Sequence, residues 1–115
     1  MPGPFLSHAA RPDWRFDLLK EQLTVGRDSK ADLQIDEQFP DWDTVSNYHA
    51  RLERRGARWV VLDGWTDGQP STNGILVNRK RTRENYLEDN FTVGFGNVEF
   101  QFHLPPSETT QGVNS

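Results

Sequence analysis

The sequence predicts an all-β domain with the architecture of a sandwich or barrel, and three observations support this prediction. Apolar and polar residues alternate over many short segments, which is the period of a strand with one buried face. Glycine, asparagine and proline separate these segments at regular intervals. No window of 11 residues carries the i, i+3, i+4, i+7 pattern of an amphipathic helix.

Segments of strand length follow one another along the middle of the chain. The charged pair at 20–21 ends the first segment, and the run at 54–57 turns the chain between two others. The run at 59–62 is apolar on both faces, so we expect it in a central strand that is covered on both sides. Residues 94–97 contain two glycines and are expected to form the last turn. The expected strands are residues 14–19, 23–25, 33–35, 50–53, 58–63, 75–77, 91–93 and 98–102.

Both ends of the chain have little apolar surface to bury. The first eleven residues are rich in proline, glycine and alanine, and the last eleven are mostly polar. We therefore expect a flexible arm over residues 1–12, a folded domain over 13–104, and a disordered tail or linker over 105–115. Because such a tail is typical of a tether, the domain is expected to be part of a larger multidomain protein.

The composition excludes several classes of function. Cysteine is absent, which rules out thiol catalysis and thiolate zinc sites and fits a cytoplasmic protein. The net charge of −4 argues against nucleic acid, and no apolar run approaches the roughly 20 residues of a membrane span. The three histidines are scattered, and the aspartates at 28, 32 and 36 lack the spacing of a calcium loop. We expect no cofactor, no metal and no direct membrane insertion.

Charge is unevenly distributed along the sequence, and two interpretations remain open. The first interpretation is a solvated surface of mixed charge with no binding role. The second is a local basic face that attracts an anionic partner. The acidic residues of the first half are Asp28, Asp32, Asp36, Glu37, Asp41 and Asp43. The basic residues that follow are Arg51, Arg54, Arg55, Arg58, Arg79, Lys80, Arg81 and Arg83.

Polar residues with binding chemistry gather where the expected strands end. Arg27 follows a glycine at a strand end, and a planar guanidinium can bind phosphate with two parallel hydrogen bonds. The Ser46 hydroxyl can donate to a phosphate oxygen, and asparagine amides can bond phosphate or peptide backbone. The short segments concerned are Gly26-Arg27, Ser46-Asn47-Tyr48-His49, Ser71-Thr72-Asn73-Gly74 and Asn78.

Simpler interpretations exist for the same residues. Asn73-Gly74 is a common hairpin turn, although a tight turn can also present a polar side chain to a ligand. Ser46 and His49 could form a nucleophilic pair, but no orienting acid or oxyanion motif accompanies them. We therefore do not expect an enzyme.

In order and spacing these segments resemble the forkhead-associated (FHA) domain family, over about residues 14–103. The resemblance implies a twisted antiparallel β-sandwich of the FHA/SMAD-like type, with disordered terminal tails. It also implies binding of phosphothreonine in partner proteins through loops at one end of the sandwich. The motifs that carry it are Gly26-Arg27, Ser46-x-x-His49, Asn73-Gly74, Val77-Asn78 and Leu87-Glu88-Asp89-Asn90.

Position by position, the resemblance assigns a role to eight residues. Arg27, Ser46 and Thr72 would hold the phosphate. Asn47 and Asn73 would hold the peptide main chain beside the phosphothreonine. The residues implied to support the site structurally are Gly26, His49 and Gly74.

The sequence also departs from the family pattern. Asn47 stands where many members have arginine, and Arg79 stands where a glycine is common. Residues 64–70 make a longer link to the Thr72 turn than is usual. The acidic loop before Ser46 predicts that acidic residues just after the phosphothreonine are disfavoured, unless the basic run at 79–83 reaches them.

Two other binding functions remain open at this point. The first is an FHA-like scaffold that binds partners without phosphate through exposed aromatic side chains. The second is a carbohydrate-binding sandwich, which would also use surface aromatics. The aromatic residues expected to be exposed are Phe39, Trp42, Tyr48 and Trp65.

Overall fold

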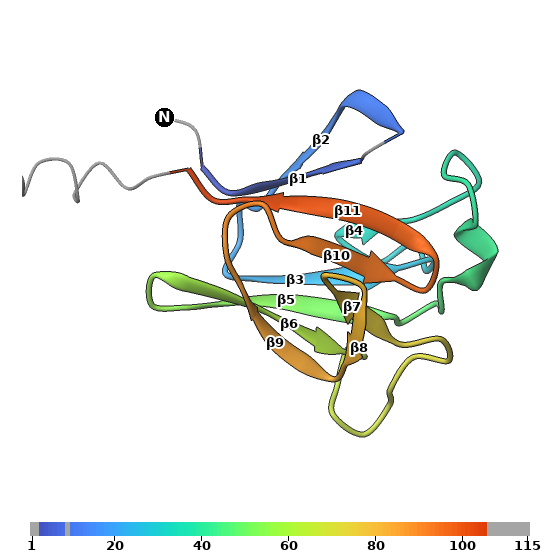
Figure 1. The fold of residues 1–115 in the computed structure, drawn as a ribbon. Helices are drawn as coiled ribbons and strands as arrows, with labels where there is room; N and C mark the ends of the chain where they lie inside the picture. Colours follow the sequence, from blue (N-terminus) through green and yellow to red (C-terminus); the bar gives the residue numbers. More distant parts are fainter. Residues whose placement is uncertain (1–2, 9, 106–115) are drawn as a thin grey trace, which may run out of the picture.

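The computed structural model describes residues 3–8 and 10–105, which form a sandwich of two β-sheets (Figure 1). In strand order, one sheet contains β2 (Arg11–Asp17), β1 (Phe5–His8), β11 (Val98–His103), β10 (Thr92–Phe95), β7 (Ile75–Val77) and β8 (Lys80–Thr82). The other contains β4 (Leu33–Gln34), β3 (Gln22–Gly26), β5 (Ala50–Arg55), β6 (Arg58–Asp63) and β9 (Glu84–Leu87). Neighbouring strands are antiparallel except β3 and β4, which are parallel. A single 3-10 turn, η1 (Trp42–Thr44), lies between β4 and β5. The predicted all-β sandwich is confirmed.

The core lies between the two sheets and consists of aliphatic and phenylalanine side chains. Strand β11 shows how the alternation creates it, because Phe100 and Phe102 are buried while the residues between them are only partly buried. The expected strand at 58–63 matches β6, and its apolar residues are buried on both faces, with exposures of 0% for Val60 and 0% for Val61. Strand β6 has a neighbour on each side, β5 and β9, as the apolar run predicted.

The expected N-terminal arm over residues 1–12 is wrong for residues 5–8 and for the start of β2. Strand β1 pairs with β2 on one side and with β11 on the other. Leu6 lies opposite Phe102 and is fully buried, and His8 is buried as well. The short alternation of β1 sits between proline- and glycine-rich neighbours, so composition over a wider window concealed it. The predicted tail falls almost entirely on residues 106–115, which lie outside the described residues.

The strands β8 and β9 and the end of β10 were also missed. Strands β8 and β9 are the outermost strands of their sheets and carry charged residues, which protect a sheet edge but weaken the apolar alternation. The expected turn at 94–97 is shorter than predicted. Phe95 is fully buried in β10, and only Gly96 and Asn97 connect β10 to β11.

The hairpin between β7 and β8 gives a prediction about stability. Asn78 and Arg79 both have positive φ, of 52° and 69°, as a two-residue hairpin turn of this kind requires. A left-handed conformation costs a residue with a Cβ about 1–2 kcal/mol, whereas glycine adopts it freely. Arg79→Gly should therefore raise the free energy of unfolding by about 0.5–1 kcal/mol, measured by urea denaturation.

Arg79→Ala is the matched control, because both variants lose the exposed ion pair of Arg79 with Glu99. Alanine keeps the Cβ and therefore keeps the strain. A glycine variant no more stable than the alanine variant would contradict the explanation.

Candidate functional site

Three loops that are distant in sequence meet at the end of the sandwich opposite the described ends of the chain (Figure 1). They connect β3 to β4, β4 to β5, and β6 to β7. The backbone N–H of Arg27 donates to the Ser46 carbonyl at 3.2 Å. The N–H of Thr72 donates to Ser46 Oγ at 3.0 Å. Ser46 therefore joins the other two loops.

Gly26 allows the end of β3 to pack against the segment that carries Ser46. A Cβ on Gly26 would lie 2.0 Å from the carbonyl oxygen of Asn47, which is far inside contact distance. The N–H of Asp28 donates to that same carbonyl oxygen, at 3.2 Å. Glycine at this position is thus a steric requirement. The close packing that it allows fixes the backbone position of the next residue, Arg27.

The side chain of Arg27 is partly buried and has an unusual feature. Its Nε is the one buried side-chain nitrogen or oxygen that has no hydrogen-bond partner among the residues the structure describes. The guanidinium carbon lies 5.6 Å from the ring centroid of Trp42, which flanks it on one side. Native proteins rarely leave a buried polar group unpaired, because its desolvation then goes uncompensated. The Nε–H of Arg27 is therefore a donor that the described protein does not satisfy.

Ser46 and His49 are locked in roles that exclude nucleophilic catalysis. His49 Nδ1 accepts the backbone N–H of Ser46 at 2.8 Å, and its Nε2 donates to the Gly74 carbonyl at 2.8 Å. Both ring nitrogens are used and the ring is neutral, so His49 cannot serve as a base for the Ser46 hydroxyl. Burial lowers the pKa of His49, and the hydrogen bond to Gly74 and the charge of Asp63 only partly oppose this. Because Ser46 Oγ accepts from Thr72, its own proton remains free to donate.

The long link at residues 64–70 is fastened to the second sheet. The N–H of Gly64 donates to the carbonyl of His49 at 2.7 Å. Arg51 is buried and binds the Gly64 carbonyl through Nη1 at 2.9 Å and Asp67 through Nη2 at 2.6 Å. The indole of Trp65 donates to the backbone of β3 at 3.0 Å. The extra residues therefore fold back onto the sheet.

At the end of this link, Ser71 is bound to Asp63, and this contact positions Thr72 near the site. Ser71 donates its backbone N–H and its hydroxyl to one oxygen of Asp63, at 3.1 and 2.6 Å. The N–H of Gly74 donates to Ser71 Oγ at 2.8 Å. The Asn73 side chain donates to the carbonyl of Thr44 at 2.7 Å, which leaves its Oδ1 free to accept. The longer link thus does not separate Thr72 and Asn73 from Ser46.

The structure brings all eight predicted site residues to this end of the molecule through the contacts above. Asn47 is exposed, and its backbone carbonyl receives the Asp28 N–H. Sequence reasoning missed Trp42, Thr44 and Arg51, which lie in no motif. The only signal for Arg51 was indirect: the apolar outer face of β6 needs a cover, and Arg51 lies opposite Leu62 across the β5–β6 pair.

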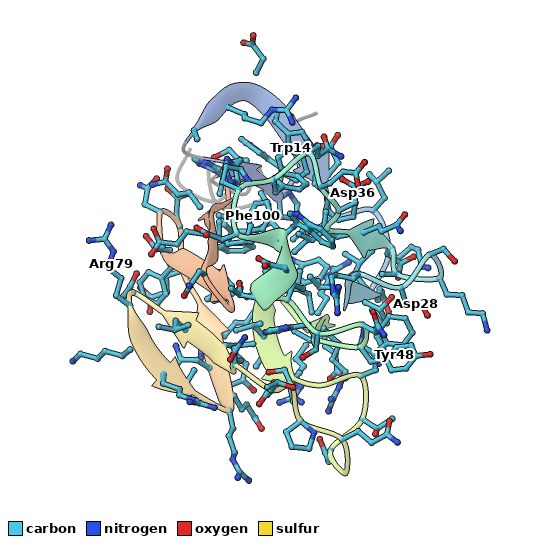
Figure 2. The ribbon with its side chains drawn as sticks, turned by 90° about the vertical axis from the view of Figure 1, so that its right-hand side faces the viewer. Trp14, Asp28, Asp36, Tyr48, Arg79 and Phe100 are labelled. Atoms are coloured by element: carbon cyan, nitrogen blue, oxygen red, sulfur yellow. The ribbon has the colours of Figure 1, made fainter. Side chains whose placement is uncertain are left out.

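Figure 2 looks onto the loops and shows Asp28 and Asp36 on one side and Arg79 on the other. The expected set of exposed aromatic residues is wrong for Phe39, which is 1% exposed and packs against Phe100, and Trp42 is only partly exposed because it packs against the core. Tyr48 is 45% exposed, and its ring meets that of the partly buried Trp65 at 4.6 Å.

Comparison with known proteins identifies the family. The family model described as the FHA domain matches residues 23–96. The chain belongs to the FHA domain family. FHA domains are non-catalytic modules of a phosphothreonine-binding family. A search of curated proteins found no significant match.

Several solved structures share the fold at low sequence identity. One, from a study of phosphothreonine-dependent FHA domain interactions, is 22% identical, with a TM-score of 0.74 over 92% of this chain and 100% of that chain. EmbR of Mycobacterium tuberculosis, solved in complex with a low-affinity phosphopeptide, is 21% identical, with a TM-score of 0.76 over 93% of this chain and 26% of EmbR. The Slr1951 protein from Synechocystis sp. is 26% identical, with a TM-score of 0.71 over 90% of this chain and 98% of that chain.

Within residues 3–8 and 10–105, no three histidine, cysteine or acidic side chains are grouped as metal ligands would be. In the same part of the chain, no helix has the length and apolar character needed to cross a membrane.

Proposed function

We propose that this FHA domain binds phosphothreonine in a partner protein through the loops around Arg27. The observation that carries the proposal is the buried Nε of Arg27, which has no partner in the described part of the protein and lies on the residue directly after Gly26. Ser46, whose carbonyl accepts the Arg27 N–H, has a hydroxyl proton to donate. Thr72 lies beside Ser46 and donates its backbone N–H to Ser46 Oγ. A cation with neutral donors around it suits a phosphate dianion.

Each predicted site residue has a role in this proposal. Phosphothreonine carries about −1.5 to −2 charges at pH 7, and the guanidinium fork can bind two of its oxygens. Ser46 and Thr72 donate to the remaining oxygens. Asn47 and Asn73 hold the peptide main chain on either side, and Asn73 Oδ1 can accept a peptide N–H. Preference for threonine over serine rests on one methyl group, worth roughly 1 kcal/mol.

The direct test compares one peptide in phosphorylated and plain forms by isothermal titration calorimetry. One dianion and a few main-chain bonds should give roughly micromolar affinity, about −8 kcal/mol, because the rigid loops lose little entropy. The plain peptide should bind at least about 100-fold more weakly. Equal affinity of the two forms would overturn the proposal and support the phosphate-independent scaffold instead.

The pH dependence of affinity gives a further prediction. The second pKa of phosphothreonine is near 6, so affinity should fall as the pH drops below about 6 and the ligand loses its second charge. A difluoromethylene phosphonate analogue has a lower second pKa and should keep its affinity to a lower pH. Parallel loss with both ligands would place the titrating group in the protein, and constant affinity from pH 7.5 to 5.5 would contradict a dianion site.

A further inference from the structure

We propose that Arg81 and Arg83 form a second anion subsite, which takes an acidic side chain of the same phosphopeptide. The inference rests on the proposed function and adds to it a preference for the flanking sequence. It concerns β8 and the residue after it, which lie outside the three loops that meet around Ser46.

A cavity beside Thr72 supplies the space for such a side chain. It has a volume of about 400 Å³ and lies between the end of the 64–70 link and the edge strand β8. Ser71 lines the cavity and directly precedes Thr72, so the cavity adjoins the proposed phosphate site. The remaining lining residues are Asp63, Pro70, Arg81, Thr82 and Arg83.

The side chain of Arg81 is held close to the phosphate loop. Gly74 has a positive φ of 82°, and a Cβ on it would lie 2.6 Å from Arg81 Nε. The guanidinium therefore packs directly on the Asn73-Gly74 turn. The Gly74 carbonyl receives the hydrogen bond from His49, which connects this turn to Ser46.

Neither arginine is neutralised within the described residues. Arg81 and Arg83 form no ion pair and no side-chain hydrogen bond there, whereas Arg51, Arg55 and Arg79 each have a carboxylate partner. The one carboxylate in the cavity wall, Asp63, already accepts two hydrogen bonds from Ser71. These donors are neutral and leave the Asp63 charge in place, so two arginines face one carboxylate across the cavity, and this net positive charge favours an anionic ligand.

The other carboxylates near the cavity are also engaged. Asp67 and Glu84 line an adjoining hollow together with Arg83. Asp67 binds Arg51 at 2.6 Å, and Glu84 binds Arg55 at 3.3 Å. Both carboxylates therefore pair with arginines of the second sheet, and neither pairs with Arg81 or Arg83.

Asp28 and Asp36 lie on the side opposite the β7–β8 hairpin in Figure 2. A peptide that crosses the loops should carry its acidic residue on the hairpin side and avoid one on the other side. The simple expectation that the acidic loop disfavours acidic residues therefore holds for one side of the phosphothreonine only.

The experiment scans single aspartates through an otherwise alanine-flanked phosphothreonine peptide. An extended peptide advances about 3.3 Å per residue, so positions from four before to four after the phosphothreonine cover the reach of the cavity. The wild-type domain, the double variant R81Q/R83Q and the control Arg79→Gln are titrated with each peptide. Arg79 is on the same hairpin but pairs with Glu99.

We expect aspartate at one or two adjacent positions to raise wild-type affinity about five- to tenfold. The double variant should lose this gain while it binds the alanine-flanked peptide within about twofold of wild type, and Arg79→Gln should keep the gain. Absence of any favourable position, a gain that persists in the double variant, or equal loss for every peptide would overturn the subsite. Failure of all phosphopeptides to bind the wild type would overturn the proposed function and the subsite with it.

Discussion

Arg27→Ala is expected to weaken binding of a phosphothreonine peptide by about 100-fold or more while the domain stays folded. The variant removes the only buried donor that lacks a partner among the described residues, so the phosphate loses a charged, two-pronged contact. The same side chain makes no ion pair with another described residue, and its removal should change the free energy of unfolding by less than about 1 kcal/mol. Calorimetry gives the affinity, and urea denaturation gives the stability.

Two further variants make this result specific. Arg27→Lys keeps the charge but loses the planar fork, so it should recover only part of the affinity. Arg54→Ala removes an arginine whose side chain pairs with Glu21 in the described structure, away from the loops, and should bind like wild type. Full affinity of Arg27→Ala for the phosphopeptide would mean that the phosphate is held elsewhere.

His49→Ala is expected to lower both stability and affinity without removing any contact to the ligand. It deletes a fully buried ring, leaves the Ser46 N–H without a partner, and leaves the Gly74 carbonyl with only its bond from the Gly96 N–H. A cavity, one unpaired N–H and one lost hydrogen bond together should cost about 3 kcal/mol of unfolding free energy. Because the ring also joins the Ser46 loop to the Thr72 turn, the folded variant should bind phosphopeptide at least about tenfold more weakly.

His8→Ala is the matched control for this variant. His8 is also buried, but its ring packs against Phe100 and against Phe39 of the β4–β5 loop, and within the described residues it makes no hydrogen bond to Ser46 or Gly74. Its loss should reduce stability and leave the affinity of the folded protein unchanged. If both histidine variants keep wild-type affinity under conditions where they are folded, His49 has only a packing role.

His49 also makes stability depend on pH in a defined direction. Burial holds its pKa in the folded state below the ordinary value of 6.5. As the pH falls below that value, the unfolded chain therefore binds a proton before the folded one does. The contribution of His49 is complete above about pH 6.5 and is lost progressively as the pH falls towards the folded-state pKa.

The fold was predictable where the apolar pattern matches the burial of a strand, as in the alternation over residues 98–102 and the continuous apolar run within residues 58–63. The predictions failed where local composition opposes the role in the fold. Strand β1 lies among prolines, alanines and one glycine, and the edge strands β8 and β9 carry charged and polar residues. Each of these segments is stabilised by its neighbours in the sheet, which a local window does not contain.

The candidate site was predictable from motifs only as a set of residues, and its geometry was not. Nothing near Arg51 in the sequence indicates that it would bind Asp67 and fasten the 64–70 link. Likewise, the contact of Asn73 with Thr44 joins two loops that share no pattern. Such long-range pairs depend on the register of the sheets, and they produce no periodic pattern in a single sequence.

The central claim is that the Arg27 guanidinium is a donor reserved for a phosphate, and nuclear magnetic resonance of its Nε–H tests this directly. The signal is assigned by its absence in Arg27→Lys, and the domain is then titrated with phosphorylated and plain forms of one peptide. We expect the Arg27 Nε–H to shift downfield and to exchange more slowly with water when the phosphopeptide binds, and to stay unchanged with the plain peptide. A phosphopeptide that binds while this signal keeps its position and exchange rate would contradict the account.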